Sequence, residues 1–219
     1  MTRAATTIAR VTIRPIAVDD APALQAIVAA VARERRYLGT TEGFTVEQAR
    51  AHIARVAAAG GVQLGAFTPG RGAHASRLVG WIDVAPGPFE GLTHSGRLGM
   101  GVATEARGRG IGARLLTQAL EEGFRTLERI ELEVFASNER ARALYLRVGF
   151  VEEGRRRCAR KLDGVCDDIL MYGLLREEWQ RHRPKMPTGR GARRARPDAY
   201  EPVIGSITTR AAARPARRR

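Results

Sequence analysis

Cysteines, aromatic residues and long apolar runs are all scarce in this sequence of 219 residues. The two cysteines, Cys158 and Cys166, fit no metal-ligand spacing. Although a hairpin would bring them together, we expect two free thiols and no metal site. No apolar stretch approaches the roughly 20 residues of a membrane span, and the N-terminal segment lacks the apolar core of a secretion signal. These absences favour a cytoplasmic protein with no membrane contact.

Acidic residues are also few, and the resulting charge imbalance is concentrated at one end of the chain. The formal net charge is +14, and residues 184–219 alone hold ten Lys or Arg against two Asp or Glu. Large apolar side chains are rare there, so burial cannot offset the entropy lost on ordering. We therefore expect a flexible N-terminus (1–9), one domain (10–178) and a basic, disordered tail (179–219).

Apolar spacing between residues 11 and 175 alternates between strand and helix patterns. Strand-like runs cover 11–16, 62–68, 77–86, 96–103, 129–135 and a hairpin at 150–175 that turns at Asp163–Gly164. Helical patterns cover 18–34, 45–61, 111–124 and 137–148. This order predicts a single α/β (α+β) domain with a mixed sheet of about seven strands and about four helices.

The stretch EARGRGIGARLL (105–116) places three glycines and three arginines within residues 107–114. It follows a predicted strand and opens a predicted helix. Free N–H groups and the helix dipole favour an anion there, and glycines let the backbone approach phosphate oxygens closely. The pattern matches neither the dinucleotide fingerprint nor a Walker loop. A pyrophosphate site is therefore predicted, with a turn carrying solvated arginines as the alternative.

Two spaced motifs extend this prediction. The spacing Arg107-x-x-Gly110-x-Gly112, preceded by LGMGVATEA, resembles the coenzyme A signature of the GNAT superfamily of N-acetyltransferases. The segment ELEVFASNERARALYLRVGFVEEG (131–154) resembles that family's second motif, a strand, an Asn-containing turn and a helix ending in Tyr. The resemblance covers residues 11–175. It implies a sheet that splays between its fourth and fifth strands, with acetyl-CoA bound in the splay as cosubstrate.

The resemblance also implies the residues that hold acetyl-CoA. The backbone of the fourth strand would pair with the pantetheine amides and polarise the thioester carbonyl. The backbone of the glycine turn would wrap the pyrophosphate. The strand residues are Met100, Gly101 and Val102, and the turn residues are Arg107, Gly108, Arg109, Gly110, Ile111 and Gly112.

Two residues of the second motif match positions with assigned roles. Asn138 matches the residue that hydrogen-bonds the pantetheine arm, and it is also a good helix cap. Tyr145 matches the residue whose hydroxyl protonates the leaving thiolate, and its helical spacing also suits core packing. Arg109 and Arg114 either reach the adenosine phosphate or are solvated.

An amine acceptor must lose a proton before it attacks the thioester. The fourth strand has no carboxylate, and Arg97 stands where some members of the family carry an acid. A water chain is one route for the proton. The candidate residues are Glu42, Asp83, Glu133 and His94.

The segment between the first two helices, residues 33–44, is implied by the resemblance to line the acceptor pocket. Tyr37, Leu38 and Phe44 would form its walls, and Glu42 would supply one carboxylate for a cationic amine. A helix end followed by a capped loop would explain the same residues.

The sequence thus predicts an N-acetyltransferase that acts by direct attack in a ternary complex, because no Cys or Ser is positioned for a covalent intermediate. The acceptor would be a small-molecule amine, an amino-acid-like compound or a protein N-terminus, and the enzyme would be a monomer or a homodimer. The alternative is a nucleic-acid- or ribosome-binding protein that acts through the Arg-rich tail. In an enzyme, that tail would make a weak polyanion contact.

Overall fold

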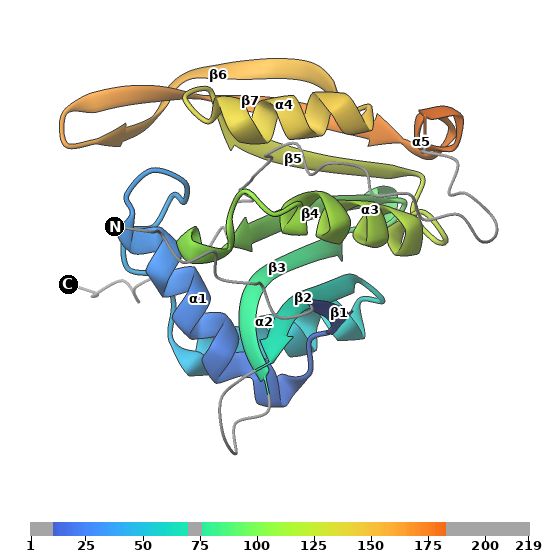
Figure 1. Ribbon diagram of the computed structural model, residues 1–219. Coiled ribbons are helices and arrows are strands. Elements are labelled where there is room, and N and C mark those ends of the chain that lie inside the picture. Colours follow the sequence, from blue (N-terminus) through green and yellow to red (C-terminus); the bar gives the residue numbers. More distant parts are fainter. Residues whose placement is uncertain (1–10, 70–75, 183–219) are drawn as a thin grey trace, which may run out of the picture.

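The computed structural model of the protein describes residues 11–69 and 76–182 (Figure 1). The predicted flexible N-terminus (1–9) and residues 183–219 of the predicted basic tail lie outside the described residues. The turn predicted between the second and third strands falls partly within the undescribed residues 70–75.

One sheet of seven strands forms the centre of the molecule, in the order β1-β2-β3-β4-β5-β7-β6. All neighbouring strands are antiparallel except β4 and β5, which are parallel. The predicted mixed sheet is therefore confirmed. The strands are β1 (Thr12–Pro15), β2 (Val62–Pro69), β3 (Ser76–Pro86), β4 (Ser95–Val102), β5 (Arg129–Phe135), β6 (Val151–Leu162) and β7 (Val165–Leu175).

The four predicted helices are present, and the described part of the chain contains a short fifth one. The helices are α1 (Ala21–Arg33), α2 (Val46–Ala58), α3 (Ile111–Gly123), α4 (Glu139–Val148) and α5 (Arg176–His182). Trp179 on α5 is buried, so ordered structure continues beyond residue 178. Within residues 11–69 and 76–182, no helix has the length and apolar character needed to cross a membrane.

The helices lie in two layers because successive strand residues point to opposite faces of the sheet. A Cβ at Gly80 of β3 would contact Leu115 of α3, whereas Asp83 on the other face lies beside His52 of α2. The ring of Tyr145 on α4 lies close to Tyr172 of β7. On β5 the predicted alternation holds: alternate residues are buried, and Glu131 and Glu133 on the opposite face are half-buried.

The sheet opens between β4 and β5, as predicted. These strands pair only at Ser95–Arg129, Gly96–Ile130 and Arg97–Glu131. Beyond that point β4 continues to Val102 and β5 to Phe135 without pairing to each other. The sheet is therefore a V, with β1 to β4 as one arm and β5, β7 and β6 as the other (Figure 1).

The predicted hairpin forms from β6 and β7 and turns at Asp163 and Gly164, whose φ angles of 52° and 81° suit a tight turn. The register shifts between Arg156 and Arg160, which leaves a bulge on β6 around Cys158. The carboxylate of Asp168 accepts hydrogen bonds from the Cys158 N–H at 2.6 Å and from Arg155. These bonds, the backbone one foremost, hold the pKa of Asp168 below its usual value.

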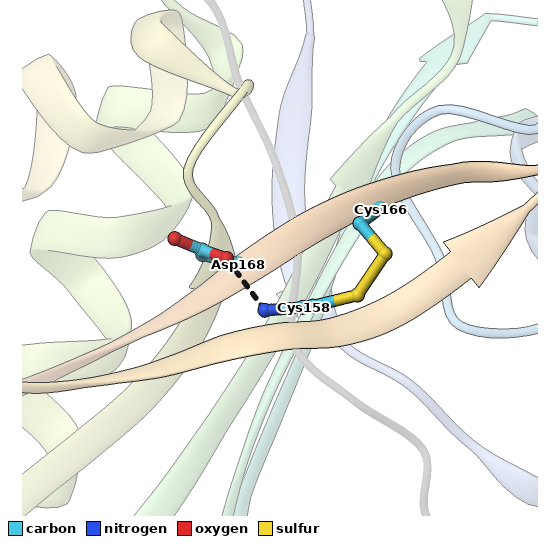
Figure 2. Close-up of a disulfide and its surroundings, with 3 residues drawn as sticks. All are labelled: Cys158, Cys166 and Asp168. Carbon is cyan, nitrogen blue, oxygen red and sulfur yellow. Dashed lines mark hydrogen bonds between the residues drawn. A yellow bond between two sulfur atoms is a disulfide. The ribbon is translucent and has the colours of Figure 1, made fainter.

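This bulge brings the two sulfur atoms together. Cys158 and Cys166 form a disulfide, with their Cα atoms 4.9 Å apart (Figure 2). The prediction of two free thiols is therefore wrong. The ladder pairs Cys166 with Lys161, and only the extra residues of the bulge turn Cys158 towards Cys166. Sequence spacing could not reveal such a local irregularity.

Candidate active site

The glycine turn joins the end of β4 to the start of α3. Gly108 and Gly110 have φ angles of 75° and 72°, a left-handed conformation that other residues adopt only with strain. A Cβ at either position would meet nothing within 4 Å, so the backbone conformation, rather than crowding, requires glycine. Gly110 is the N-cap of α3, and no side chain caps the helix there. The amides of the first turn, starting at Ile111 and Gly112, therefore offer a site for an anion.

The side chain of Arg107 serves a different purpose from the backbone of the turn. Its guanidinium donates two hydrogen bonds to the carboxylate of Glu34, at 2.7 and 2.6 Å, and its Nε donates to the carbonyl of Val102 at 3.0 Å. It also lies 4.9 Å from the ring centre of Tyr37. Arg107 thus ties the glycine turn to the end of α1. Arg109, in contrast, is exposed.

Glu34 was missed by the sequence analysis. It lies 73 residues from its partner, and no local pattern links the two. One signal was available: an acidic residue at the C-terminal end of a helix faces an unfavourable dipole and therefore requires a cationic partner. Glu34 is the C-cap of α1.

The open edge of β4 faces the splay. The Ala103 N–H donates to Val79 of β3 at 2.9 Å. Since backbone groups alternate along an antiparallel strand, those of Met100 and Val102 are directed away from β3 and towards β5. At Gly101, a Cβ would lie 2.0 Å from the ring of Trp81, so only glycine fits. The edge predicted to pair with pantetheine is thus directed into the splay.

Tyr145 lies on α4, beside the other arm of the V, and Asn138 precedes this helix as its N-cap. Asn138 is buried and caps α4, its side chain accepting the Ala141 N–H at 3.3 Å. Tyr145 is fully buried, and its ring lies 5.7 Å from Phe150 and 6.4 Å from Tyr172, centre to centre. The capping and packing roles are thus observed, and the catalytic roles stay predictions.

The candidate proton acceptors lie in different surroundings. Glu133 is bound through one carboxylate oxygen by Arg97 and through the other by Arg156. Asp83 is buried, with one oxygen 3.5 Å from Nε2 of His52, a residue absent from the sequence prediction. Glu42 is exposed in the loop after α1. None of these is grouped with other residues as a metal site would require, and the described residues hold no cluster of three His, Cys, Asp or Glu suited to a metal ion.

His94 takes a structural position. Its carbonyl accepts hydrogen bonds from the N–H groups of Glu128, at 2.8 Å, and Arg129, at 3.3 Å. These bonds lie at the closed end of the V, where β4 and β5 begin to pair. His94 therefore lies at the opposite end of β4 from the glycine turn.

The loop between α1 and α2 carries the residues that the sequence analysis assigned to an acceptor pocket. Leu38 is buried in the core, and Tyr37 and Phe44 are half-buried against it. Beside them, Arg35 binds Asp163 at the tip of the β6–β7 hairpin with two hydrogen bonds of 2.6 and 2.8 Å, which lower the pKa of Asp163. Arg160 also donates to the carbonyl of Arg35 at 2.6 Å. The loop and the hairpin thus bridge the open end of the V.

A cavity of about 290 Å³ lies where β4, β5 and β7 meet. Among its charged groups, Arg129 donates to Glu153 at 2.7 Å, and this bond is the main cause of the lowered pKa of Glu153. The lining residues are Arg97, Arg129, Glu131, Leu132, Glu133, Glu153, Met171 and Tyr172. The candidate base Glu133 therefore shares one hollow with Arg97, the residue that stands where some members of the family carry an acid.

Comparison with known proteins agrees with this geometry. Residues 65–150, which include the glycine turn and Tyr145, match the model of the Acetyltransferase (GNAT) family. A curated relative from Bacillus subtilis (strain 168), "Putative ribosomal N-acetyltransferase YdaF", is 33% identical over 93 residues, or 41% of this chain. The match spans only 50% of the length of that relative.

Solved structures resemble most of the described fold. A ribosomal-protein-alanine N-acetyltransferase from Brucella melitensis is 27% identical, with a TM-score of 0.66 over 75% of this chain and 99% of that chain. A GNAT superfamily phosphinothricin acetyltransferase from Sinorhizobium meliloti, solved in complex with AcCoA, has a TM-score of 0.68 over 75% of this chain and 88% of that chain. It is 14% identical and shares the fold alone. The splayed sheet and the two sequence motifs agree with the family match, so we conclude that residues 65–150 form a GNAT acetyltransferase region and that the surrounding fold resembles the fold of these solved structures.

Proposed function

We propose that this protein transfers an acetyl group from acetyl-CoA to a primary amine by direct attack in a ternary complex. One observation carries the proposal: the free edge of β4 is followed, after one short 3-10 helix (Thr104–Ala106), by the glycine turn and the start of α3, which no side chain caps. In acetyl-CoA the pantetheine arm carries amides and leads to a pyrophosphate. Its hydrogen-bonding groups therefore follow the same order as these elements of the protein. The AcCoA complex of the structural neighbour supports this proposal.

In this proposal, acetyl-CoA supplies the acetyl thioester, and the residues of the chain orient it. The backbone groups of Met100 and Val102, which face the splay, hold the pantetheine amides and polarise the thioester carbonyl, whereas the backbone of Gly101 is directed towards β3. The amides of residues 108–112 hold the pyrophosphate, since the Arg107 N–H already donates to the carbonyl of Thr104 at 3.3 Å. Asn138 hydrogen-bonds the pantetheine arm while it caps α4, and the Tyr145 hydroxyl gives its proton to the departing thiolate.

The acceptor amine lies between the α1–α2 loop and the β6–β7 hairpin, against Tyr37, Leu38 and Phe44. Glu42, Asp83, Glu133 or a water chain takes its proton. The names of two relatives point to a ribosomal protein, and thus to a protein N-terminus. Amino-acid-like compounds and small amines are the other acceptors proposed.

The proposal is tested by measuring coenzyme A release with a panel of amines, amino acids and short peptides. Calorimetric binding of acetyl-CoA to the same protein provides a second readout. We expect acetyl-CoA to bind and at least one class of amine to be acetylated. A protein that binds no acetyl-CoA and releases no coenzyme A with any acceptor would contradict the proposal.

The glycine turn gives a direct prediction: Gly110→Val is expected to weaken acetyl-CoA binding roughly tenfold. A β-branched residue is strained at a φ of 72°, at a cost of about 1–2 kcal/mol, and its side chain would occupy the space left for phosphate. Calorimetry measures the affinity. Gly91→Val is the matched control, because a Cβ there also meets nothing within 4 Å and its φ is ordinary. Equal affinities in the two variants would remove the turn from the site.

A polyanion contact is the second candidate role, favoured by the net charge of +8 in residues 184–219. A chain ending at Pro184 is expected to keep its acetyltransferase activity and to lose more than tenfold in affinity for RNA or heparin. Binding at a series of salt concentrations measures this, since the slope reports the number of ionic contacts. If the shortened chain binds RNA or heparin with unchanged affinity, the polyanion contact is made by the domain and not by residues 185–219.

Location and oligomeric state are also part of this proposal. We propose a cytoplasmic protein, either a monomer or a homodimer. The disulfide between Cys158 and Cys166 weighs against the location, because the cytoplasm of most cells keeps such pairs reduced. A count of free thiols in protein prepared directly from its cells tests the location. Two free thiols would support the cytoplasm, and an intact disulfide would support an oxidising compartment.

A further inference from the structure

Three strands contribute to a cluster of charges on the acceptor side of the V. Arg97 on β4 and Arg156 on β6 each bind one carboxylate oxygen of Glu133 on β5. The side chain of Glu133 is 17% exposed, whereas those of Arg97 and Arg156 are 41% and 48% exposed. The carboxylate is thus on the inside of the cluster, and both guanidinium groups are open to solvent.

The cluster lies within reach of the proposed reaction centre. Arg97 precedes Met100 by three residues on β4, which corresponds to about 10 Å along the strand. Arg97 alternates with Leu98 and therefore points to the same face of the strand as Gly99 and Gly101, away from α3. Arg97 and Glu133 also line the cavity of about 290 Å³. An acceptor whose amine reaches the thioester therefore has its next few atoms beside this cluster.

The chemistry of the cluster suits an anion. A guanidinium carries five N–H donors in a planar fork that fits a carboxylate with two parallel hydrogen bonds. Arg97 and Arg156 each use only part of this capacity on Glu133. The neighbouring Arg129 differs, because its guanidinium is shared between Glu153 and Glu131 and is only 25% exposed.

We propose that Arg97 and Arg156 bind a carboxylate that the acceptor carries near its reacting amine, and that Glu133 holds the two arginines in place until the acceptor arrives. This inference rests on the proposed function and names its substrate class. The class comprises amines with a carboxylate within about 10 Å of the nitrogen. Free amino acids and peptides with an acidic residue next to the N-terminus both satisfy this requirement.

The experiment compares acceptors that differ only in this charge. One pair is a peptide with Asp or Asn at its second position, and the other is an amino acid and its carboxamide. In the full-length protein the carboxylate is expected to raise kcat/KM roughly 10- to 100-fold, as for a hydrogen bond to a charged group. The peptide pair and the amino-acid pair separate the two sources of the carboxylate. Equal kcat/KM within both pairs would overturn the inference.

Variants locate the effect. Arg97→Gln and Arg156→Gln are each expected to reduce the carboxylate preference at least tenfold, and Arg97→Lys to restore part of it, since lysine keeps the charge without the fork. Arg50→Gln, which removes an exposed arginine from α2, is the control and should keep the preference. A preference that survives both glutamine variants would contradict the assignment of these arginines. Melting temperatures verify that each variant is folded.

Direct binding separates this inference from the proposed function. The same acceptors are titrated into the protein in the presence of coenzyme A, and calorimetry reports their affinity without any transfer. Glu133→Gln is expected to bind the carboxylate peptide several-fold more tightly, because the ligand no longer competes with a carboxylate of the protein. Unchanged or weaker binding would overturn the inference, even if acetyl transfer occurs. Tighter binding without transfer would support this anion site while the proposed function fails.

Discussion

Replacing Tyr145 with phenylalanine is expected to lower turnover about 100-fold and to leave acetyl-CoA affinity within about twofold. General acid catalysis contributes roughly 10²–10⁴-fold, and the lower end applies because a thiolate already leaves fairly well without a proton. The ring of Tyr145 is fully buried against Phe150 and Tyr172, so phenylalanine fills the same space. Steady-state rates at saturating acetyl-CoA measure the loss.

Tyr172→Phe is the matched control for this experiment. Tyr172 is equally buried, burial raises its pKa, and its hydroxyl donates to Glu152 at 2.9 Å. Removing that hydroxyl is expected to change the melting temperature without a comparable loss of turnover. A normal rate in the Tyr145 variant would limit Tyr145 to core packing and leave protonation of the thiolate to water.

The second large effect is expected at Glu34, whose replacement by alanine should lower the melting temperature by roughly 5–10 °C and weaken acetyl-CoA binding. The side chain of Arg107 is only 11% exposed, and the variant removes the carboxylate to which its guanidinium donates two hydrogen bonds. Removing one partner of a largely buried ion pair costs about 2–3 kcal/mol. Affinity should fall as well, because Arg107 fixes the start of the glycine turn.

A nearby exposed pair provides the control. Arg77 binds Glu105 beside the same turn, but the two side chains are 66% and 53% exposed. Such a pair contributes about 0–1 kcal/mol, so Glu105→Ala should hardly change the melting temperature. The double variant Glu34→Ala with Arg107→Ala should recover part of the lost stability, since it removes the largely buried guanidinium together with its carboxylate partner. Equal melting temperatures for Glu34→Ala and Glu105→Ala would contradict this account.

The elements that the sequence predicted correctly are those specified by local patterns. The strict alternation of Ile130, Leu132 and Val134 with two glutamates defines β5 and its buried face. The turn at Asp163–Gly164 forms because both residues adopt a positive φ. The splay itself was expected only through the resemblance of two motifs to a known family, because neither periodicity nor propensity indicates where a sheet divides.

The features that the sequence did not predict depend on tertiary register. Glu133 was one candidate base among several, and its binding by Arg97 and Arg156 arises only because three strands meet at particular pairings. The disulfide depends on extra residues in β6 that no alternation pattern reveals. Such contacts join residues that are distant in sequence or out of step with the regular ladder, so a reading of local pattern cannot find them.

The division of the sheet also bears on aggregation. Unpaired strand edges commonly recruit strands from other molecules. Here the free edges of β4 and β5 face each other inside the V, and the contact between Arg35 and Asp163 bridges its open end. The outer edges differ: β1 has only four residues, and β6 carries a run of arginines at 155–157. Short and charged edges resist such pairing, so the protein keeps the unpaired edges of two strands inside the V and does not offer them to its neighbours in solution.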